Sequence, residues 1–208
     1  MLLGEPIPRQ LPATLVVAVD AFGLADAETA AALQPMVRAL SMLVGYVRED
    51  LLAPPGLSVW SRAQRTLQPS EAWLTFKDWL DRDNPRLQFS VARGLALAAA
   101  IPESDRQWAA LMRAEARARL AWLVPPGAIL CMPTTPFPAP RTGLSLAALE
   151  PLRARIGCLT AHGGLTGVPQ VSVPGATVDG LPVGLSIVGA RGSDATLVAV
   201  AGALEARR

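Results

Sequence analysis

Short apolar runs, bounded by glycine or proline, mark four places along the chain. They cover residues 13–19, 128–132, 168–173 and 181–188. Apolar runs of this length between glycine and proline predict β-strands, and the last two runs are also rich in β-branched residues. Within the last run only Ser186 is polar, which is typical of a strand that is covered on both faces.

Apolar positions at helical spacing predict helices between and after these runs. Asp26 is the expected N-cap of a helix that reaches about Val44, and Ser104 is the expected cap of one that reaches about Val124. Further helices are expected at residues 69–80, 89–100 and 145–159, and from Ser193 or Asp194 onward. A strand followed by a helix at residues 13–44 indicates an α/β architecture.

Proline and glycine predict where these elements stop. Residues 1–12 hold three prolines and are expected to form an irregular lead-in. The sequence Pro-Pro-Gly at residues 54–56 breaks the chain and leaves residues 57–68 undecided. Pro-Gly and Asp-Gly at residues 174–180 predict a turn, and the prolines at 169, 174 and 182 are expected at strand ends because they cannot donate to a ladder. The length of 208 residues suits one domain, residues 1–208.

The composition excludes several classes of function. Hydrophobic residues make up 51% of the chain, charged residues 17%, and the formal net charge of +2 is too small to indicate nucleic acid or an anionic membrane as a partner. The longest uncharged apolar run, at residues 95–101, is far shorter than the roughly 20 residues of a spanning helix. Residues 1–5 do not resemble a signal peptide, and Cys131 and Cys158 are expected to be reduced, so a cytoplasmic location is expected.

A row of arginines lies on the helix expected at residues 104–124. Arg113, Arg117 and Arg119 alternate there with apolar positions. This pattern favours a solvated helix face. A contact surface for a partner is the alternative.

Residues 160–201 carry motifs that indicate a family. The string G-V-P-Q-V-S-V-P at residues 167–174, the string G-L-P-V-G-L-S-I-V-G at residues 180–189 and a helix opening at Ser193 resemble the C-terminal part of the amidase signature family. The resemblance is looser at residues 15–33 and 128–140. It implies part of that family's fold, a mixed β-sheet core covered by helices, and a relation to enzymes that hydrolyse amides with a serine, a cis-serine and a lysine.

The same resemblance implies which residues face the substrate. The string P-T-T-P-F-P-A-P at residues 133–140 is similar to a family loop that lies close to the substrate cleft. The implied residues of the cleft wall are therefore Thr134 and Thr135, together with Leu165, Gly167 and Pro169 of the following motif. Read from the residues alone, residues 133–140 are equally compatible with a loop that merely leaves a strand.

The residues that would perform the chemistry are missing from the sequence. No Ser-Ser pair exists, and the only lysine, Lys77, has Leu74 rather than serine three residues before it. His162, the only histidine, is expected to have an ordinary polar or capping role, and a pair with Cys158 is disfavoured because residues 163–164, Gly-Gly, suggest that the helix has ended. One histidine and two distant cysteines cannot form a structural zinc site, and no nucleotide-binding motif is present. No catalytic residue, metal or cofactor is predicted.

We therefore interpret the chain as an amidase-like protein that is a fragment, or one half of a split hydrolase. The expected partners are the missing N-terminal half, a second copy of this chain through self-association, and a small amide only once the site is completed. The alternative is a non-catalytic remnant with a binding or regulatory role. A small independent hydrolase with an unrecognised nucleophile is the third hypothesis. Alone, the chain is expected to release no ammonia from simple amides.

Overall fold

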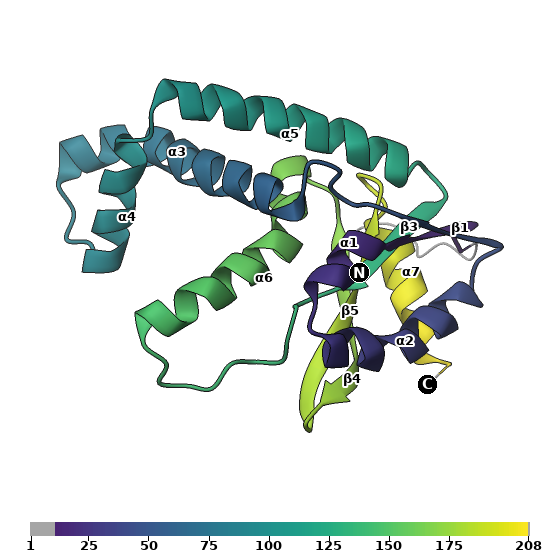
Figure 1. Cartoon of the computed structure of the whole chain (residues 1–208). Helices are drawn as coiled ribbons and strands as arrows, with labels where there is room; N and C mark the ends of the chain where they lie inside the picture. The colour runs from purple at the N-terminus through teal and green to yellow at the C-terminus, as the bar shows by residue number, and fades with distance from the viewer. Residues whose placement is uncertain (1–10, 208) are drawn as a thin grey trace.

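The computed structural model describes residues 11–207, which form an α/β fold (Figure 1). Of the lead-in expected at residues 1–12, residues 1–10 lie outside the described residues. Within that range one sheet has five strands, β1 Thr14–Ala18, β2 Tyr46–Asp50, β3 Ala128–Pro133, β4 Gln170–Val178 and β5 Leu181–Gly189. Their order is β2-β1-β3-β5-β4. The strands β2, β1 and β3 are parallel, and β5 is antiparallel to both β3 and β4, so the sheet is mixed as the family resemblance implied.

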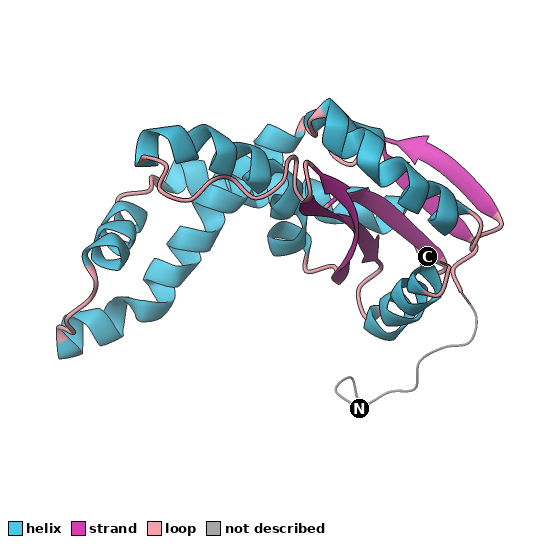
Figure 2. Cartoon of the chain, turned by 90° about the horizontal axis from the view of Figure 1, so that it is seen from below, coloured by secondary structure: helices cyan, strands magenta, loops and turns pink. Residues whose placement is uncertain are grey.

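Seven helices accompany the sheet in the described part of the chain. They are α1 Val19–Leu24, α2 Ala27–Ser41, α3 Leu57–Asp83, α4 Phe89–Ala99, α5 Glu103–Leu123, α6 Leu146–Thr166 and α7 Asp194–Glu205. Helices lie on both sides of the sheet, while α4 and the distal part of α3 project away from it (Figures 1 and 2). Among residues 11–207, no helix is long and apolar enough to cross a membrane.

Two buried clusters form on the two faces of the sheet. On one face, α2 and α7 pack with Leu33 and Leu197 against Ile129 and Ile187. On the other, α3, α5 and α6 pack with Trp60, Leu120 and Leu159 against Leu130, Met132 and Val188. Because successive side chains of a strand point to opposite faces, β3 and β5 contribute to both clusters. This explains why the run at residues 181–188 is apolar at almost every position.

The four predicted strands and the helices from Asp26 and Phe89 are confirmed. Asp26 occupies the N-cap of α2, although its side chain makes no capping bond and instead pairs with Arg155 at 2.7 Å. Two elements were missed, β2 and the short helix α1. β2 reads Y-V-R-E-D and lies at the edge of the sheet, so it lacks the apolar run of a buried strand.

The predicted start of a helix at Pro69 is wrong. α3 begins at Leu57 and passes through Pro69 without ending. Its buried side chains continue from Trp60 and Ala63 to Leu67 on the near side of the proline and Ser70 on the far side. Packing of this face against α5 and α6 outweighs the local cost of a proline, which in a helix interior is about 3 kcal/mol.

The predicted end of α6 before the Gly-Gly pair at 163–164 is also wrong. α6 begins after Ser145, whose Oγ accepts a bond of 3.2 Å from the Ala148 amide, and continues to Thr166. The glycines allow α6 to approach α3 closely. A Cβ placed on Gly164 would lie 2.2 Å from the Gln64 amide nitrogen, and one on Gly157 would lie 3.0 Å from the Ser61 hydroxyl.

Three smaller predictions are corrected. Pro102, not Ser104, is the N-cap of α5. Only residues 179–180 form the tight turn predicted for residues 174–180, because β4 extends to Val178 with a bulge at Pro174 and Ala176. Pro174 thus lies within a strand rather than at its end, and β4 is an edge strand, where proline is tolerated.

The arginine row of α5 is only partly solvated. Arg117 is exposed, but Arg113 pairs with Glu71 at 2.6 Å and Arg119 pairs with Asp50 at 2.7 Å. The guanidinium of Arg119 also lies 4.7 Å from the ring centre of Trp122. These contacts join α5 to α3 and β2, so two of the three arginines stabilise the fold rather than simply facing water.

Candidate functional site

Four polar side chains form a continuous hydrogen-bonded row on one face of the sheet. The Thr134 hydroxyl lies 2.8 Å from the Ser172 hydroxyl and 2.9 Å from the Ser186 hydroxyl. Gln170 donates through Nε2 to the Ser186 oxygen at 2.7 Å. We call Thr134, Gln170, Ser172 and Ser186 the hydroxyl row. Ser186 is fully buried, whereas Gln170 and Ser172 are exposed, so the middle of the row is buried and both of its ends reach the surface.

Strand register explains why these four residues meet. Ser172 of β4 pairs with Ser186 of β5, and Ser186 pairs in turn with Met132 of β3. Thr134 lies two residues beyond Met132 and points to the same face, and its amide donates to the Gly184 carbonyl at 2.9 Å. The row therefore lies at the carboxyl end of β3, on the face that α3, α5 and α6 cover in part.

Gly184 makes room for this row. A Cβ placed on it would lie 3.0 Å from the Ser172 hydroxyl and 3.3 Å from the Thr134 hydroxyl. The Val173 carbonyl would lie at 3.2 Å. Any larger residue at position 184 therefore pushes against both hydroxyls, and the glycine serves close packing rather than an unusual backbone angle.

The structure places the five predicted cleft-wall residues in two groups. Thr134 belongs to the hydroxyl row, and the hydroxyl of its neighbour Thr135 donates to the Phe137 carbonyl at 2.9 Å. Leu165, Gly167 and Pro169 lie instead at the end of α6 and in the link to β4. Leu165 is fully buried, Gly167 ends α6 in the left-handed conformation with φ 71°, and the Pro169 carbonyl accepts from the Gly189 amide at 3.2 Å. Their role as substrate contacts remains a prediction.

His162 is a buried group beside the hydroxyl row. It lies on α6 and is 1% exposed, and within residues 11–207 neither ring nitrogen has a hydrogen-bond partner. Burial lowers the pKa of His162 to about 4, which the nearby Gln170 side chain opposes. The imidazole is therefore neutral at pH 7. The capping role expected for it is not seen, since the helix continues past it to Thr166.

Sequence reasoning assigned no role to Asp20, whereas the structure shows one. Asp20 is the second residue of α1, two positions after the end of β1, and its carboxylate accepts from the Leu52 and Ala53 amides at 2.8 and 2.9 Å. It fixes the segment after β2 at the carboxyl end of two parallel strands, beside a cavity of about 320 Å³ that Cys158 also lines. Ligands of α/β sheets commonly bind at this end. An aspartate immediately after a buried strand was the sequence feature that could have revealed it.

No described side chain is prepared to act as an activated nucleophile. Burial raises the pKa of Cys131 to about 12 and also raises that of Cys158. Lys77 lies on the projecting part of α3, where its ammonium group pairs with Asp81 at 2.9 Å, and this pairing raises the pKa of Lys77. Within residues 11–207, histidine, cysteine and acidic residues form no group of three that could hold a metal ion. The hydroxyl row offers hydrogen bonds to a polar ligand, but on its own it lacks a base.

Comparison with known proteins shows which proteins this chain is similar to. No profile of a known protein family matches the chain. The chain is 35% identical to Amidase 1 of Oryza sativa subsp. japonica over 160 residues, which are 76% of this chain and 37% of that protein. It is also 28% identical to Amidase 1 of Arabidopsis thaliana over 152 residues, which are 73% of this chain and 36% of that protein.

Solved structures agree with the sequence relatives. An amidase crystal structure that is 31% identical superposes with a TM-score of 0.76 over 98% of this chain and 48% of its own. A protein described as a bacterial aryl acylamidase of the amidase signature family, 18% identical, shares the fold with a TM-score of 0.72 over 98% of this chain and 44% of its own. The chain is thus similar to amidases and spans about half the length of these structures. More narrowly, it is a relative of the amidase signature family.

Proposed function

We propose that this chain supplies one wall of the substrate cleft in an amide hydrolase whose nucleophile and base come from elsewhere. The observation that carries the proposal is the hydroxyl row, an accessible set of hydrogen-bonding groups at the carboxyl end of β3. The matched relatives are at least about twice as long as the region they share with the chain, which supports a separate catalytic half. That half would lie in a longer chain or on a second polypeptide.

The role of Thr134 follows from its geometry. When Ser172 and Ser186 both donate to it, the Thr134 hydroxyl keeps its own hydrogen to donate to an amide carbonyl or to the developing oxyanion. Catalysis needs in addition a nucleophile and a base within hydrogen-bond reach, which the proposal assigns to the other half. Thr135, Gly167 and Pro169 would shape the cleft, and Leu165 would support it from the core. The cytoplasm remains the proposed location.

A mass measurement in the source cell tests the proposal first. The intact mass of the native protein, paired with the DNA upstream of the Met1 codon, shows whether a larger product exists. A product about twice the 21.8 kDa of this chain, or an upstream frame with a Gly-Ser-Ser-Gly loop and a lysine, would support a working amidase. A product of 21.8 kDa with no such frame, and with no second polypeptide that copurifies with it, would contradict the proposal and favour a non-catalytic binding protein.

Turnover tests the role of the hydroxyl row directly. Combined with a half that carries the serine–lysine loop, the chain should release ammonia from a simple primary amide, and alone it should release none. Thr134→Val should lower kcat by about tenfold or more, since it removes one hydrogen-bonding hydroxyl from the cleft. Thr160→Val, which changes an exposed hydroxyl on α6, is the matched control. Equal rates for both variants would remove Thr134 from the site.

A further inference from the structure

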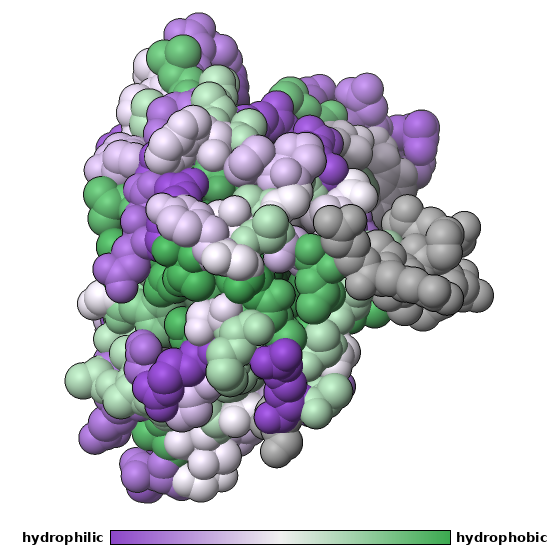
Figure 3. Space-filling model, turned by 90° about the vertical axis from the view of Figure 1, so that its right-hand side faces the viewer, coloured by the Kyte–Doolittle hydropathy of each residue, from purple (hydrophilic) through white to green (hydrophobic). Residues whose placement is uncertain are grey.

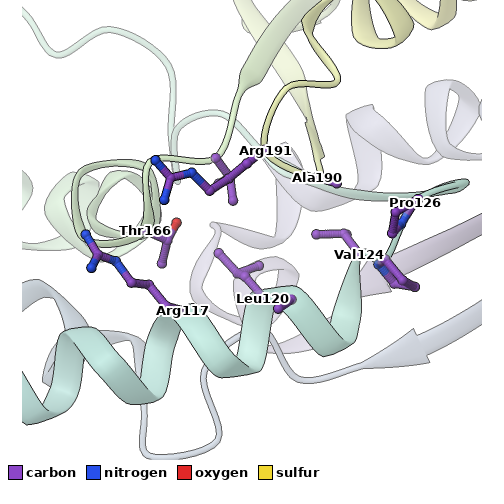
Figure 4. A pocket seen from close by; sticks show the side chains of 10 residues that line it. Arg117, Leu120, Val124, Pro126, Thr166, Ala190 and Arg191 are labelled. Atoms are coloured by element: carbon purple, nitrogen blue, oxygen red, sulfur yellow. The ribbon is translucent and has the colours of Figure 1, made fainter.

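A second pocket lies apart from the hydroxyl row, at the amino end of β3. It has a volume of about 260 Å³ and is bounded by the end of α5, the end of α6 and the segment after β5 (Figure 4). Pro125 and Pro126, which precede β3, form part of its wall, whereas the hydroxyl row lies at the opposite end of that strand. A ligand in this pocket would not occupy the proposed cleft.

The interior of this pocket is apolar. Leu120 and Val124 are almost completely buried and form one side, while Val168 and Ala190 contribute from the other elements. Thr166 is the one hydroxyl in the lining, and it already donates to the His162 carbonyl at 2.6 Å within α6. An apolar group is therefore the part of a ligand that this interior suits.

Two arginines give the rim a positive charge. Arg117 of α5 and Arg191 after β5 lie on either side of Thr166 at one end of the pocket (Figure 4). Both are exposed, and among residues 11–207 neither makes a hydrogen bond or an ion pair. Arg113 and Arg119 on the same helix do have acidic partners. A planar guanidinium is well suited to a carboxylate.

The C-terminal end of α6 explains the position of Arg191 but not that of Arg117. A Cβ placed on Gly167 would lie 3.6 Å from the Arg191 guanidinium, so this side chain lies over the C-terminal turn, where a positive charge is favoured. That explains why one cation is stable there. It does not explain a second cation, on a different helix, beside the same apolar pocket.

We propose that this pocket binds a small organic carboxylate with a compact apolar body. The apolar part would lie against Leu120, Val124 and Val168, and the carboxylate would accept hydrogen bonds from Arg117 and Arg191. Both interactions are needed for useful affinity, because exposed charge pairs alone contribute little in water. The proposal concerns binding and is independent of amide hydrolysis.

Isothermal titration of the whole chain with 3-phenylpropionate tests it, with 3-phenylpropan-1-ol as the uncharged probe. The acid should bind saturably, and the alcohol should bind about tenfold more weakly or not at all. Arg117→Gln and Arg191→Gln should each weaken binding of the acid by about fivefold. Arg93→Gln, on the exposed face of α4, is the matched control and should change nothing.

A further variant tests the apolar cavity separately from the charged rim. Ala121 is exposed and lines the pocket, so Ala121→Phe should fill it without disturbing the core and should abolish binding. Circular dichroism of each variant checks that the fold is kept. The proposal is overturned by no saturable binding of the acid, by equal binding of acid and alcohol, or by arginine variants that bind as the original chain does.

Discussion

The sheet and the projecting helices of this chain are built in opposite ways. β3 is buried at every position, and both faces of the sheet carry a closed apolar cluster. The distal part of α3 and α4, residues 71–99, instead leave large apolar side chains in solvent, including Phe89 at 80% exposure and Leu74 at 67%. We call residues 71–99 the helical arm. The comparison indicates that stability resides in the sheet, while the arm adds surface to the molecule.

Truncation of one side chain in each region should give the largest difference. Leu130→Ala removes a fully buried side chain from the centre of β3, so the free energy of unfolding should fall by about 3 kcal/mol. Phe89→Ala should change it by less than about 0.5 kcal/mol, because that ring is already in water. Urea denaturation followed by circular dichroism measures both. Similar losses for the two variants would mean that the arm is packed against something in solution.

The pH dependence of unfolding tests the same comparison through His162, a buried residue of α6. Burial lowers the pKa of His162 to about 4, below its ordinary value of 6.5. Between those values the unfolded chain binds a proton and the folded chain does not, so stability falls as the pH is lowered from 6.5 to 4. The full effect is on the order of 3 kcal/mol.

Replacement of His162 isolates this contribution. In His162→Leu the loss of stability between pH 6.5 and 4 should shrink by about that amount, because no proton is taken up at this position. Urea midpoints at about pH 7, 5.5 and 4.5 provide the measurement. An unchanged pH profile would show that His162 is not buried in its neutral form. The exposed arm offers no such dependence through its only lysine, Lys77, which titrates far above this range.

The same contrast governs what sequence reasoning could find. The runs at residues 128–132 and 181–188 predicted strands because burial on both faces requires apolar residues at nearly every position. The glycine and proline motifs of residues 167–189 led to the right family. Pro69 and the Gly-Gly pair at 163–164 led to wrong predictions of where α3 begins and where α6 ends, since tertiary packing of α3 against α6 overrides local helix breakers.

The candidate site was predictable only in part. Thr134 was named through the family resemblance, but Ser172, Ser186 and Gln170 were not, because only strand register brings them together. A contact between residues that are 38 or 52 positions apart cannot be read from their spacing in the sequence. For the same reason the sequence could not predict that the two arginines of the second pocket lie together, since Arg117 is on α5 and Arg191 is in the segment after β5.

A smaller effect is expected at the loop that Asp20 holds. Asp20→Asn leaves one carbonyl oxygen to accept from the Leu52 and Ala53 amides, so the free energy of unfolding should fall by about 1–2 kcal/mol. Asp78→Asn, in the arm and with its side chain 96% exposed, is the matched control and should be neutral. Thermal melting of both variants gives the measurement. A neutral Asp20→Asn would show that β2 and its loop are held by other contacts.

The smallest effect on stability, and the most informative for assembly, concerns the sheet edge. β2 is an edge strand with Tyr46 60% and Val47 42% exposed, and apolar side chains gather on the face at this end of the molecule (Figure 3). Unpaired strand edges promote association, and an inserted lysine opposes it. Val47→Lys should therefore shift the isolated chain toward monomer in sedimentation velocity, with little change in its unfolding free energy.

A variant in the arm decides between the two surfaces. If Phe89→Gln shifts the chain toward monomer and Val47→Lys does not, association proceeds through the arm rather than through the sheet edge. If Val47→Lys alone acts, the edge of β2 is where a second polypeptide would extend the sheet. That outcome would agree with the proposal that a further half completes the fold. A chain that is monomeric without either substitution would favour a binding protein that is stable by itself.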